Sequence, residues 1–391
     1  MKKVKLNKQG FKFGNVLTIS FAHLVHDIYS SFLAPILPLL IEKLSISYSM
    51  VGFLSLIQRL PSLINPFVGL MADRIALRYL LIFSPLITAV SMSLLGLAPS
   101  VTVLAIMLLV MGVSSTMFHV PGPVMINKVS GKLTGRGMSF FMFGGEMART
   151  IGPLIILGGV SLWGLEGTYK LIPLGLVATV ILYFKLRKIR IAGEFSKNDQ
   201  WSGIGNTLRK HLPLFMILMG MTFFRSVMKS ALTTFLPTYM NLKGESLWMG
   251  GISLSILELA GAIGTLFIGS YSDKIGRKAV LLIISIAAPV MMWLFTISGK
   301  PLELPLLVLL GFFLFGFTPV VLALIQDRAT ERPAFLNGIY MTISFGMGAL
   351  AVLLVGALSD WIGMEQTFRI SAYLSLGAVP FVLMLIEKPK S

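Results

Sequence analysis

Twelve long apolar runs follow one another along the 391-residue chain, and each is long enough to cross a membrane as a helix. A helix of about 20 apolar residues spans the roughly 30 Å hydrocarbon core of a bilayer. The helices of a large soluble protein would carry polar faces at helical spacing, and most of these runs have none. Charged residues make up only 13% of the chain, too few to cover a soluble surface. The sequence therefore predicts an all-α membrane protein with twelve transmembrane helices, at about 15–41, 49–72, 79–98, 101–126, 137–161, 167–186, 213–240, 248–271, 279–298, 302–326, 334–358 and 366–386.

The runs form two groups of six, separated by one long polar connection. This division predicts two six-helix bundles joined by a linker, with a short tail at each end. The N-terminal tail holds five lysines but no apolar core followed by a small-residue cleavage site, so we interpret it as a cytoplasmic tail. The predicted segments are the N-terminal tail 1–14, the first bundle 15–186, the cytoplasmic linker 187–212, the second bundle 213–386 and the C-terminal tail 387–391.

Lysine and arginine are concentrated on one side of the predicted membrane. Twenty-four of the 33 lie in the two tails, the linker and the loops on that side, whereas five lie in the loops of the opposite side. The positive-inside rule therefore predicts that both termini are cytoplasmic. The net charge of +17 is then mainly a topology signal, aided by anionic lipid headgroups, and does not indicate a nucleic-acid surface. Cysteine is absent, which excludes disulfides, thiol catalysis and Cys-ligated metal sites.

Two charged turns with the same pattern lie 200 residues apart, each between two apolar runs. A glycine permits close backbone approach at a tight turn, and the Asp and cations that follow can form ion pairs between helix ends. Positive charge for topology explains the cations but leaves the aligned Gly and Asp unexplained. We expect both turns to form a conformational latch on the cytoplasmic side, with the residues Gly69, Asp73, Arg74, Arg78, Gly269, Asp273, Lys274, Arg277 and Lys278.

The doubled turn and the twelve runs together resemble the major facilitator superfamily. The second turn matches the loop motif of that family well, whereas the first has Ala76 and Leu77 where Gly and Arg are typical. The resemblance implies two pseudo-symmetric six-helix bundles that rock around a central site by alternating access. It also implies that spans 1, 4, 7 and 10 line the cavity and that 3, 6, 9 and 12 are outer scaffold helices.

Ionisable residues inside the runs are costly in a bilayer, and each is therefore a candidate site residue. His23, His26 and Asp27 share one helix face by their i, i+3 and i+4 spacing. Four intramembrane cations outnumber three acids, which favours an anionic substrate. Burial raises a carboxyl pKa toward neutrality, so the acids and two histidines are candidate proton carriers. The expected substrate-binding residues are Arg59, His119, Arg149, Arg225 and Lys229. The expected proton-coupling residues are His23, His26, Asp27, Glu146 and Glu258.

Two of these assignments have plainer alternatives. Glu146 and Arg149 are three residues apart and could form a structural salt bridge. His119 could be a hydrogen-bonded packing residue.

Short segments in spans 1, 4 and 5 narrow the resemblance. The segments Ala22–Asp27 and Phe118–Pro121 look like the span-1 and span-4 signatures of the fosmidomycin-resistance family, with Ala22 and Val120 as departures. Span 5 carries Ala-Arg-Thr-Ile-Gly-Pro at 148–153, similar to a motif of proton-coupled drug exporters. The resemblance implies export of an anionic phosphonate drug, which agrees with the cationic cavity inferred from charge.

The sequence thus predicts a secondary active transporter, with proton-coupled efflux of a small anionic or amphipathic compound as the first choice. Organic-anion or metabolite uptake by proton symport is the nearest alternative, and a lipid or lysolipid flippase of the same fold is the third. We expect no enzyme activity, cofactor or metal, since the four histidines show no metal-ligand spacing. We expect a monomer in the bacterial inner (plasma) membrane, whose partners are a small-molecule substrate, protons and the lipid bilayer.

Overall fold

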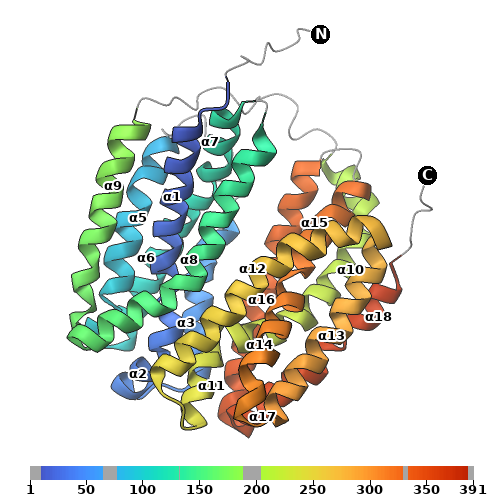
Figure 1. Ribbon diagram of the computed structural model, residues 1–391. Coiled ribbons are helices and arrows are strands. Elements are labelled where there is room, and N and C mark those ends of the chain that lie inside the picture. Colours follow the sequence, from blue (N-terminus) through green and yellow to red (C-terminus); the bar gives the residue numbers. More distant parts are fainter. Residues whose placement is uncertain (1–9, 65–76, 132, 188–203, 329–332, 386–391) are drawn as a thin grey trace.

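The computed structural model describes residues 10–64, 77–131, 133–187, 204–328 and 333–385, and this part of the chain is almost entirely helical. The helices form two bundles that lie side by side (Figure 1). The predicted fold class, an all-α membrane protein with two bundles, is confirmed.

The N-terminal bundle contains the helical segments up to the linker. Its helices are α1 (Phe13–Ser30), α2 (Leu33–Leu44), α3 (Tyr48–Arg59), η1 (Leu60–Ile64), α5 (Leu77–Ser93), η3 (Leu95–Leu97), α6 (Val101–His119), α7 (Pro121–Ser130), α8 (Thr134–Trp163), η4 (Glu166–Leu171) and α9 (Ile172–Leu186).

The C-terminal bundle contains the remaining segments. They are α10 (Ile204–Ser230), the π-helical turn η5 (Ala231–Phe235), α11 (Leu236–Leu242), α12 (Leu247–Ile275), α13 (Arg277–Ile297), α14 (Lys300–Phe315), α15 (Phe317–Arg328), α16 (Pro333–Ile362), α17 (Met364–Ser375) and α18 (Ala378–Leu383).

Ten of the predicted spans are long and apolar enough to cross a membrane within the described residues. The described part of the second predicted span consists of α3 and η1, and the rest of that prediction, 65–72, lies outside the described residues. The twelfth is divided into α17 and α18, which are each too short alone. Breaks of this kind are common in transporter helices, because neighbouring helices satisfy the backbone groups that a break leaves unpaired.

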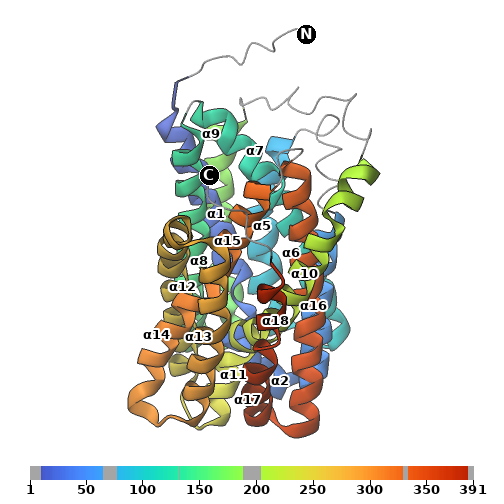
Figure 2. The same cartoon turned by 90° about the vertical axis from the view of Figure 1, so that its right-hand side faces the viewer.

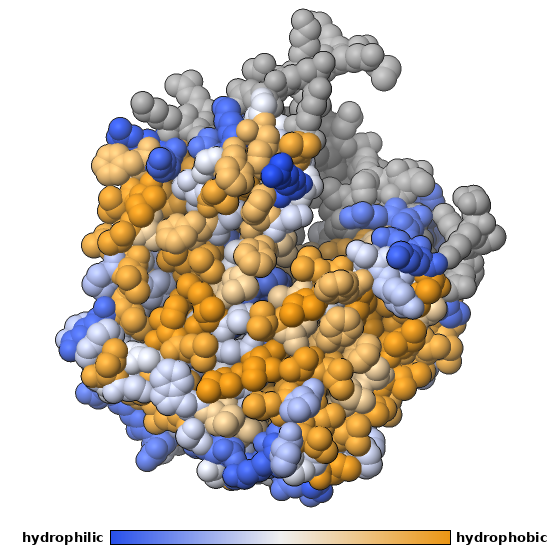
Figure 3. Space-filling model, in the orientation of Figure 1, coloured by the Kyte–Doolittle hydropathy of each residue, from blue (hydrophilic) through white to orange (hydrophobic). Residues whose placement is uncertain are grey.

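The outer surface of both bundles is apolar. Figure 3 shows hydrophobic side chains over the flanks of the molecule and hydrophilic ones mainly at its two ends. Leu174 and Phe184 on α9 and Phe267 on α12 are each more than 60% exposed. Large exposed apolar surfaces are unfavourable in water but match the hydrocarbon core of a bilayer. This surface agrees with a chain that crosses the membrane several times.

The helices of both bundles run between the same two ends of the molecule (Figures 1 and 2). We call one of them the linker end, where α9 finishes and α10 begins. The other is the far end, where α3 and α12 begin and α16 finishes (Figure 1).

The two bundles are packed tightly at the far end. A Cβ atom added at Gly356 of α16 would lie 2.4 Å from the Tyr48 carbonyl oxygen of α3, so only glycine permits this approach. The Asp360 carboxylate, also on α16, accepts the backbone N–H groups of Tyr48 and Ser49, each at 2.8 Å. Trp248 Nε1 donates to Ser161 Oγ at 2.9 Å and thereby joins α12 to α8. Toward the linker end, by contrast, the surface is hollowed between the bundles (Figure 3).

Candidate functional site

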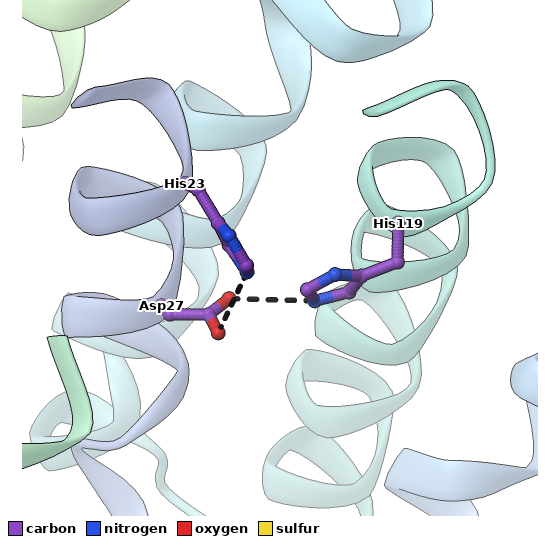
Figure 4. Close-up of side chains that lie close together, drawn as sticks. All are labelled: His23, Asp27 and His119. Carbon is purple, nitrogen blue, oxygen red and sulfur yellow. Dashed lines mark ion pairs between the residues drawn. The ribbon is translucent and has the colours of Figure 1, made fainter. Parts of the chain in front are cut away.

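A buried carboxylate, Asp27, lies at the centre of a cluster of histidines. His23 and His26 are on the same helix, α1, and His119 comes from the end of α6. Asp27 Oδ2 lies 3.3 Å from His23 Nε2, and Asp27 Oδ1 lies 3.3 Å from His119 Nε2 (Figure 4). His26 Nδ1 lies 2.9 Å from Asp27 Oδ1 and donates to it. The i, i+3 and i+4 face predicted from the sequence is therefore present, and the structure adds His119 opposite it.

The ring of His23 is fixed by helix α8. Its Nδ1 lies 2.7 Å from the Phe141 carbonyl oxygen, which can only accept, so Nδ1 carries the proton of this bond. The ring also stacks on Phe141, with 4.0 Å between centroids. A Cβ atom at Gly145 would lie 2.6 Å from His23 Cε1, so this glycine makes room for the ring. These contacts direct Nε2 toward Asp27.

The position of His119 follows from a break between two helices. Pro121 begins α7 and lacks a backbone N–H, which favours a new helix start and ends α6 at His119. The side chain of His119 is 38% exposed, whereas that of Asp27 is buried. The cluster is therefore reachable from one side, through His119.

Arg149 on α8 contacts three carboxylates. It pairs with Glu146 one turn away, lies 3.5 Å from Glu258 Oε2 through its Nε, and lies 3.8 Å from Asp27 Oδ2 through Nη1. The ion pair between Glu146 and Arg149, considered above as an alternative to their functional roles, is present. Glu258 lies on α12, so the Arg149–Glu258 contact joins the N-terminal bundle to the C-terminal bundle.

A cavity of about 210 Å³ lies between the two bundles beside this contact. Its charged lining residues are Arg59, Arg149 and Glu258. The remaining polar lining comes from Ser30, Ser31, Ser55, Gln58, Thr233 and Thr234. These six residues were not predicted from the sequence, because hydroxyl and amide side chains cost little free energy in a membrane helix and resemble ordinary packing residues. Their one signal is the adjacency of Gln58 to Arg59.

Of the predicted substrate-binding residues, Arg59 and Arg149 line this cavity, whereas His119, Arg225 and Lys229 do not. Arg225 is buried and its Nη2 donates to the Leu314 carbonyl oxygen at 2.7 Å. Its guanidinium also lies 4.6 Å from the centroid of the Phe317 ring. Lys229 Nζ lies 5.2 Å from the centroid of Phe315. The last carbonyls of α14 lack partners within the helix, and Arg225 satisfies one of them.

The residues of the second predicted latch make contacts within the C-terminal bundle. Gly276 has a φ of +103°, a conformation that glycine adopts readily, and it allows the turn between α12 and α13. Arg277 pairs with Asp273 at 2.5 Å and with Asp327 of α15 at 3.0 Å. Lys278 Nζ donates to the Leu383 carbonyl oxygen of α18. Gly269 and Lys274 lie in the last two turns of α12.

In the first latch, Gly69, Asp73 and Arg74 lie outside the described residues. Arg78 is described, and its guanidinium lies 4.8 Å from the centroid of the Tyr79 ring.

Comparisons with known proteins agree with this architecture. The fosmidomycin resistance protein of Escherichia coli (strain K12) is 26% identical over 368 residues, covering 93% of this chain and 91% of that protein. The multidrug resistance protein MdtG of Yersinia enterocolitica is 24% identical over 365 residues, covering 88% of this chain and 86% of that protein. A solved bacterial homolog of the human lysosomal transporter Spinster, in an inward-facing and occupied conformation, superposes with a TM-score of 0.81 at 13% identity. That match covers 96% of this chain and 97% of the other.

The family model of the Major Facilitator Superfamily matches residues 19–352 and 259–391. The two matched ranges together include almost all of both bundles. The predicted family resemblance is confirmed, and the chain belongs to the Major Facilitator Superfamily of multi-pass membrane transporters.

Proposed function

We propose that the protein is a secondary active transporter that exports a small anionic or amphipathic compound in exchange for protons, by alternating access. The observation that carries this proposal is the Arg149–Glu258 contact, which joins the two bundles beside a polar cavity. The fosmidomycin and multidrug resistance named for the two relatives support export. Most Lys and Arg residues lie in the tails, the linker and the loops on the same side as the linker. This distribution supports a cytoplasmic linker end, with the protein in the bacterial inner membrane.

The cavity lining supports an anion as the substrate. Two guanidinium groups, those of Arg59 and Arg149, face one lining carboxylate, that of Glu258. Guanidinium groups bind carboxylate, phosphate and phosphonate oxygens through paired N–H donors. The serine and threonine hydroxyls and Gln58 add further donors. A volume of about 210 Å³ corresponds to roughly seven water molecules, which favours a small solute.

The same contact suggests how protons and substrate exchange. Arg149 Nε and Glu258 Oε2 lie 3.5 Å apart, and neither atom has a hydrogen-bond partner among the described residues. A proton on Glu258 removes the attraction between the bundles, and so does an anion that neutralises Arg149. Either the proton or the anion therefore permits the bundles to rock. The protein that has neither ligand bound keeps the Arg149–Glu258 contact. A carrier that moves with one ligand or the other exchanges the two.

Proton-coupled uptake of an organic anion is the second candidate, and it follows from the same pair. When Glu258 is protonated, one of the carboxylates that compete for Arg149 is neutral, so an anion binds Arg149 more strongly and the two ligands reinforce each other's binding. A carrier that moves mainly with both ligands bound is a symporter. A lipid flippase is the third candidate, and it receives less support because the cavity lining is polar.

The remaining predicted roles are kept as predictions. His119, Arg225 and Lys229 are predicted to contact substrate in some state of the cycle, and Glu146 to share the proton-coupling role. His23, His26 and Asp27 keep their predicted role in proton coupling. The two charged turns are proposed to latch the linker end when it closes, because the contacts of Arg277 hold α12, α13 and α15 together.

Transport in proteoliposomes with an imposed pH gradient tests the proposal. Fosmidomycin is the probe, and the variants are Arg149→Ala, Arg59→Ala and Glu258→Gln. The matched control is Arg369→Gln, which removes a cation paired within α17. We expect gradient-driven movement in the wild type and control, and at least a tenfold loss in both cavity-arginine variants.

Glu258→Gln imitates the protonated carboxyl, so it should abolish the response to the pH gradient while it preserves exchange of labelled for unlabelled fosmidomycin. Gradient-driven accumulation by Glu258→Gln would contradict the coupling mechanism. No movement by folded wild-type protein would remove fosmidomycin as a substrate.

A further inference from the structure

The histidines show no metal-ligand spacing along the sequence, but the fold brings two of them together with Asp27 at the spacing of a metal site. We propose that His23 Nε2, the Asp27 carboxylate and His119 Nε2 bind a divalent transition metal ion of the Zn²⁺ or Co²⁺ class. One ligand atom from each of these residues lies within 4.8 Å of the other two. Two imidazoles and one carboxylate, with a position left for water or another ligand, form a common set for such ions. This inference does not depend on the proposed transport mechanism.

The two short edges of the cluster fit a tetrahedral ion. Ligand atoms about 2.1 Å from a tetrahedral ion are separated by roughly 3.4 Å. The His23 Nε2–Asp27 Oδ2 and His119 Nε2–Asp27 Oδ1 distances are both 3.3 Å, each to a different carboxylate oxygen. An ion between the two imidazoles would therefore take the carboxylate through both oxygens, or through one of them after a movement of the exposed His119 ring.

The hydrogen bond of His23 supplies the second reason. Its Nδ1–H donates to the Phe141 carbonyl, so in the neutral ring Nε2 presents a lone pair. That lone pair faces a carboxylate oxygen 3.3 Å away, an arrangement that is repulsive unless a proton or a metal ion lies between the two atoms. Donation of the other ring N–H to a backbone carbonyl is also the usual support of a metal-bound histidine.

His26 acts as a positioning residue in this arrangement. It is fully buried and donates through Nδ1 to Asp27 Oδ1 at 2.9 Å, while its ring stacks on Phe118 with 4.5 Å between centroids. The carboxylate is thus held from behind by His26, and its face toward His23 and His119 is left for an ion.

The charges around the cluster also favour a divalent cation. The nearest cation is Arg149, whose Nη1 is 3.8 Å from Asp27 Oδ2, but its guanidinium is shared with Glu146 and Glu258. Three carboxylates thus surround one guanidinium. With neutral imidazoles, these three carboxylates and one guanidinium carry two excess negative charges. Arg59, Arg225 and Lys229 make no ion pair with Asp27 among the described residues, so one divalent ion can neutralise the charge left at the cluster.

The placement of the ligands allows binding without hindering transport. All three come from α1 and α6, which belong to the same bundle, so an ion would not tie the two bundles together. The exposed His119 side chain provides the route of entry.

Metal titration of the purified full-length protein, prepared without a polyhistidine tag, tests the proposal. Zn²⁺ binding is measured by calorimetry, and Co²⁺ binding by the visible absorption of the bound ion. The variants are His119→Ala, which removes an exposed ligand, and Asp27→Asn. His211→Ala is the matched control, because His211 lies on α10 outside the cluster.

We expect saturable binding of one ion by the wild type and by His211→Ala, with an intense Co²⁺ absorption typical of tetrahedral geometry. Affinity should fall at least tenfold in His119→Ala, whose folding is checked by its thermal unfolding curve. Absence of saturable binding by the wild type would overturn the proposal. The cluster would then bind a proton and no metal ion. Equal affinities in the wild type and His119→Ala would overturn it as well, because the ions would then be bound elsewhere.

Discussion

Replacing Asp360 with alanine should shift the protein toward conformations that are open at the far end. The carboxylate of Asp360 accepts the N–H groups of Tyr48 and Ser49, the first two residues of α3. Ser47 Oγ accepts the N–H of Met50, so the start of α3 is capped from both bundles. Of these capping contacts at the start of α3, those of Asp360 cross between the bundles, and they exist only while the far end is closed.

The size of the shift can be worked out from these contacts. Loss of an N-terminal cap costs about 0.5–2 kcal/mol, and a carboxylate near a helix N-terminus adds about 0.3–1 kcal/mol. Asp360 is exposed to solvent, so water can replace part of both contributions. We therefore expect the substitution to reduce the free energy that favours far-end closure by about 1–2 kcal/mol. This changes the ratio of far-end-closed to far-end-open protein by roughly 5- to 30-fold. Asp360→Asn keeps an acceptor oxygen but loses the charge, and should give a smaller change.

Distances between spin labels measure this ratio. The chain has no cysteine, so labels can be attached at Tyr169→Cys in the N-terminal bundle and Leu242→Cys in the C-terminal bundle. Both positions are exposed. The matched control is Glu365→Ala, which removes an acid that pairs with Arg369 inside α17. If Asp360→Ala gives the same distance distribution as Glu365→Ala, the Asp360 contacts do not hold the far end closed.

Three further predictions follow from close contacts. Gly145→Ala should lower the free energy of unfolding by about 1–3 kcal/mol, because its Cβ would lie 2.6 Å from the ring of His23, and thermal unfolding checks this. Gly52→Ala should weaken far-end closure, because its Cβ would lie 2.9 Å from the Val352 carbonyl oxygen, and the same spin labels would report it as a larger fraction of long distances. Arg277→Gln should lower the free energy of unfolding by about 1 kcal/mol or less, because its partners Asp273 and Asp327 are largely exposed. A much larger loss of stability in thermal unfolding would contradict this account of the turn.

The fold could be predicted from the sequence because the bilayer restricts the possibilities so strongly. Apolar runs of membrane-spanning length predict helices, and the repeated turn predicts two related bundles. The division of single spans into shorter pieces was not predicted, for example α1 and α2 within the first span. Such breaks depend on side chains and neighbouring helices that supply hydrogen bonds, and a hydropathy pattern does not contain them.

The residues of the site that share one helix could be predicted to lie together, whereas contacts between residues of different helices could not. The shared face of His23, His26 and Asp27 follows from helical spacing alone. The approach of His119, far along the chain, depends on how α1 and α6 pack. From the number of charged residues alone, Arg225 was expected to need an anion as its partner. In the structure its guanidinium instead donates to a carbonyl oxygen at the end of α14 and lies over an aromatic ring. Backbone acceptors of this kind are invisible in a count of charged side chains.

The most direct test of the central claim is exchange by Glu258→Gln in proteoliposomes. If the Arg149–Glu258 contact couples proton and substrate, this variant should exchange labelled for unlabelled fosmidomycin as the wild type does, yet fail to accumulate it in response to a pH gradient. Accumulation at the wild-type level would show that the proton is carried elsewhere and would contradict the account.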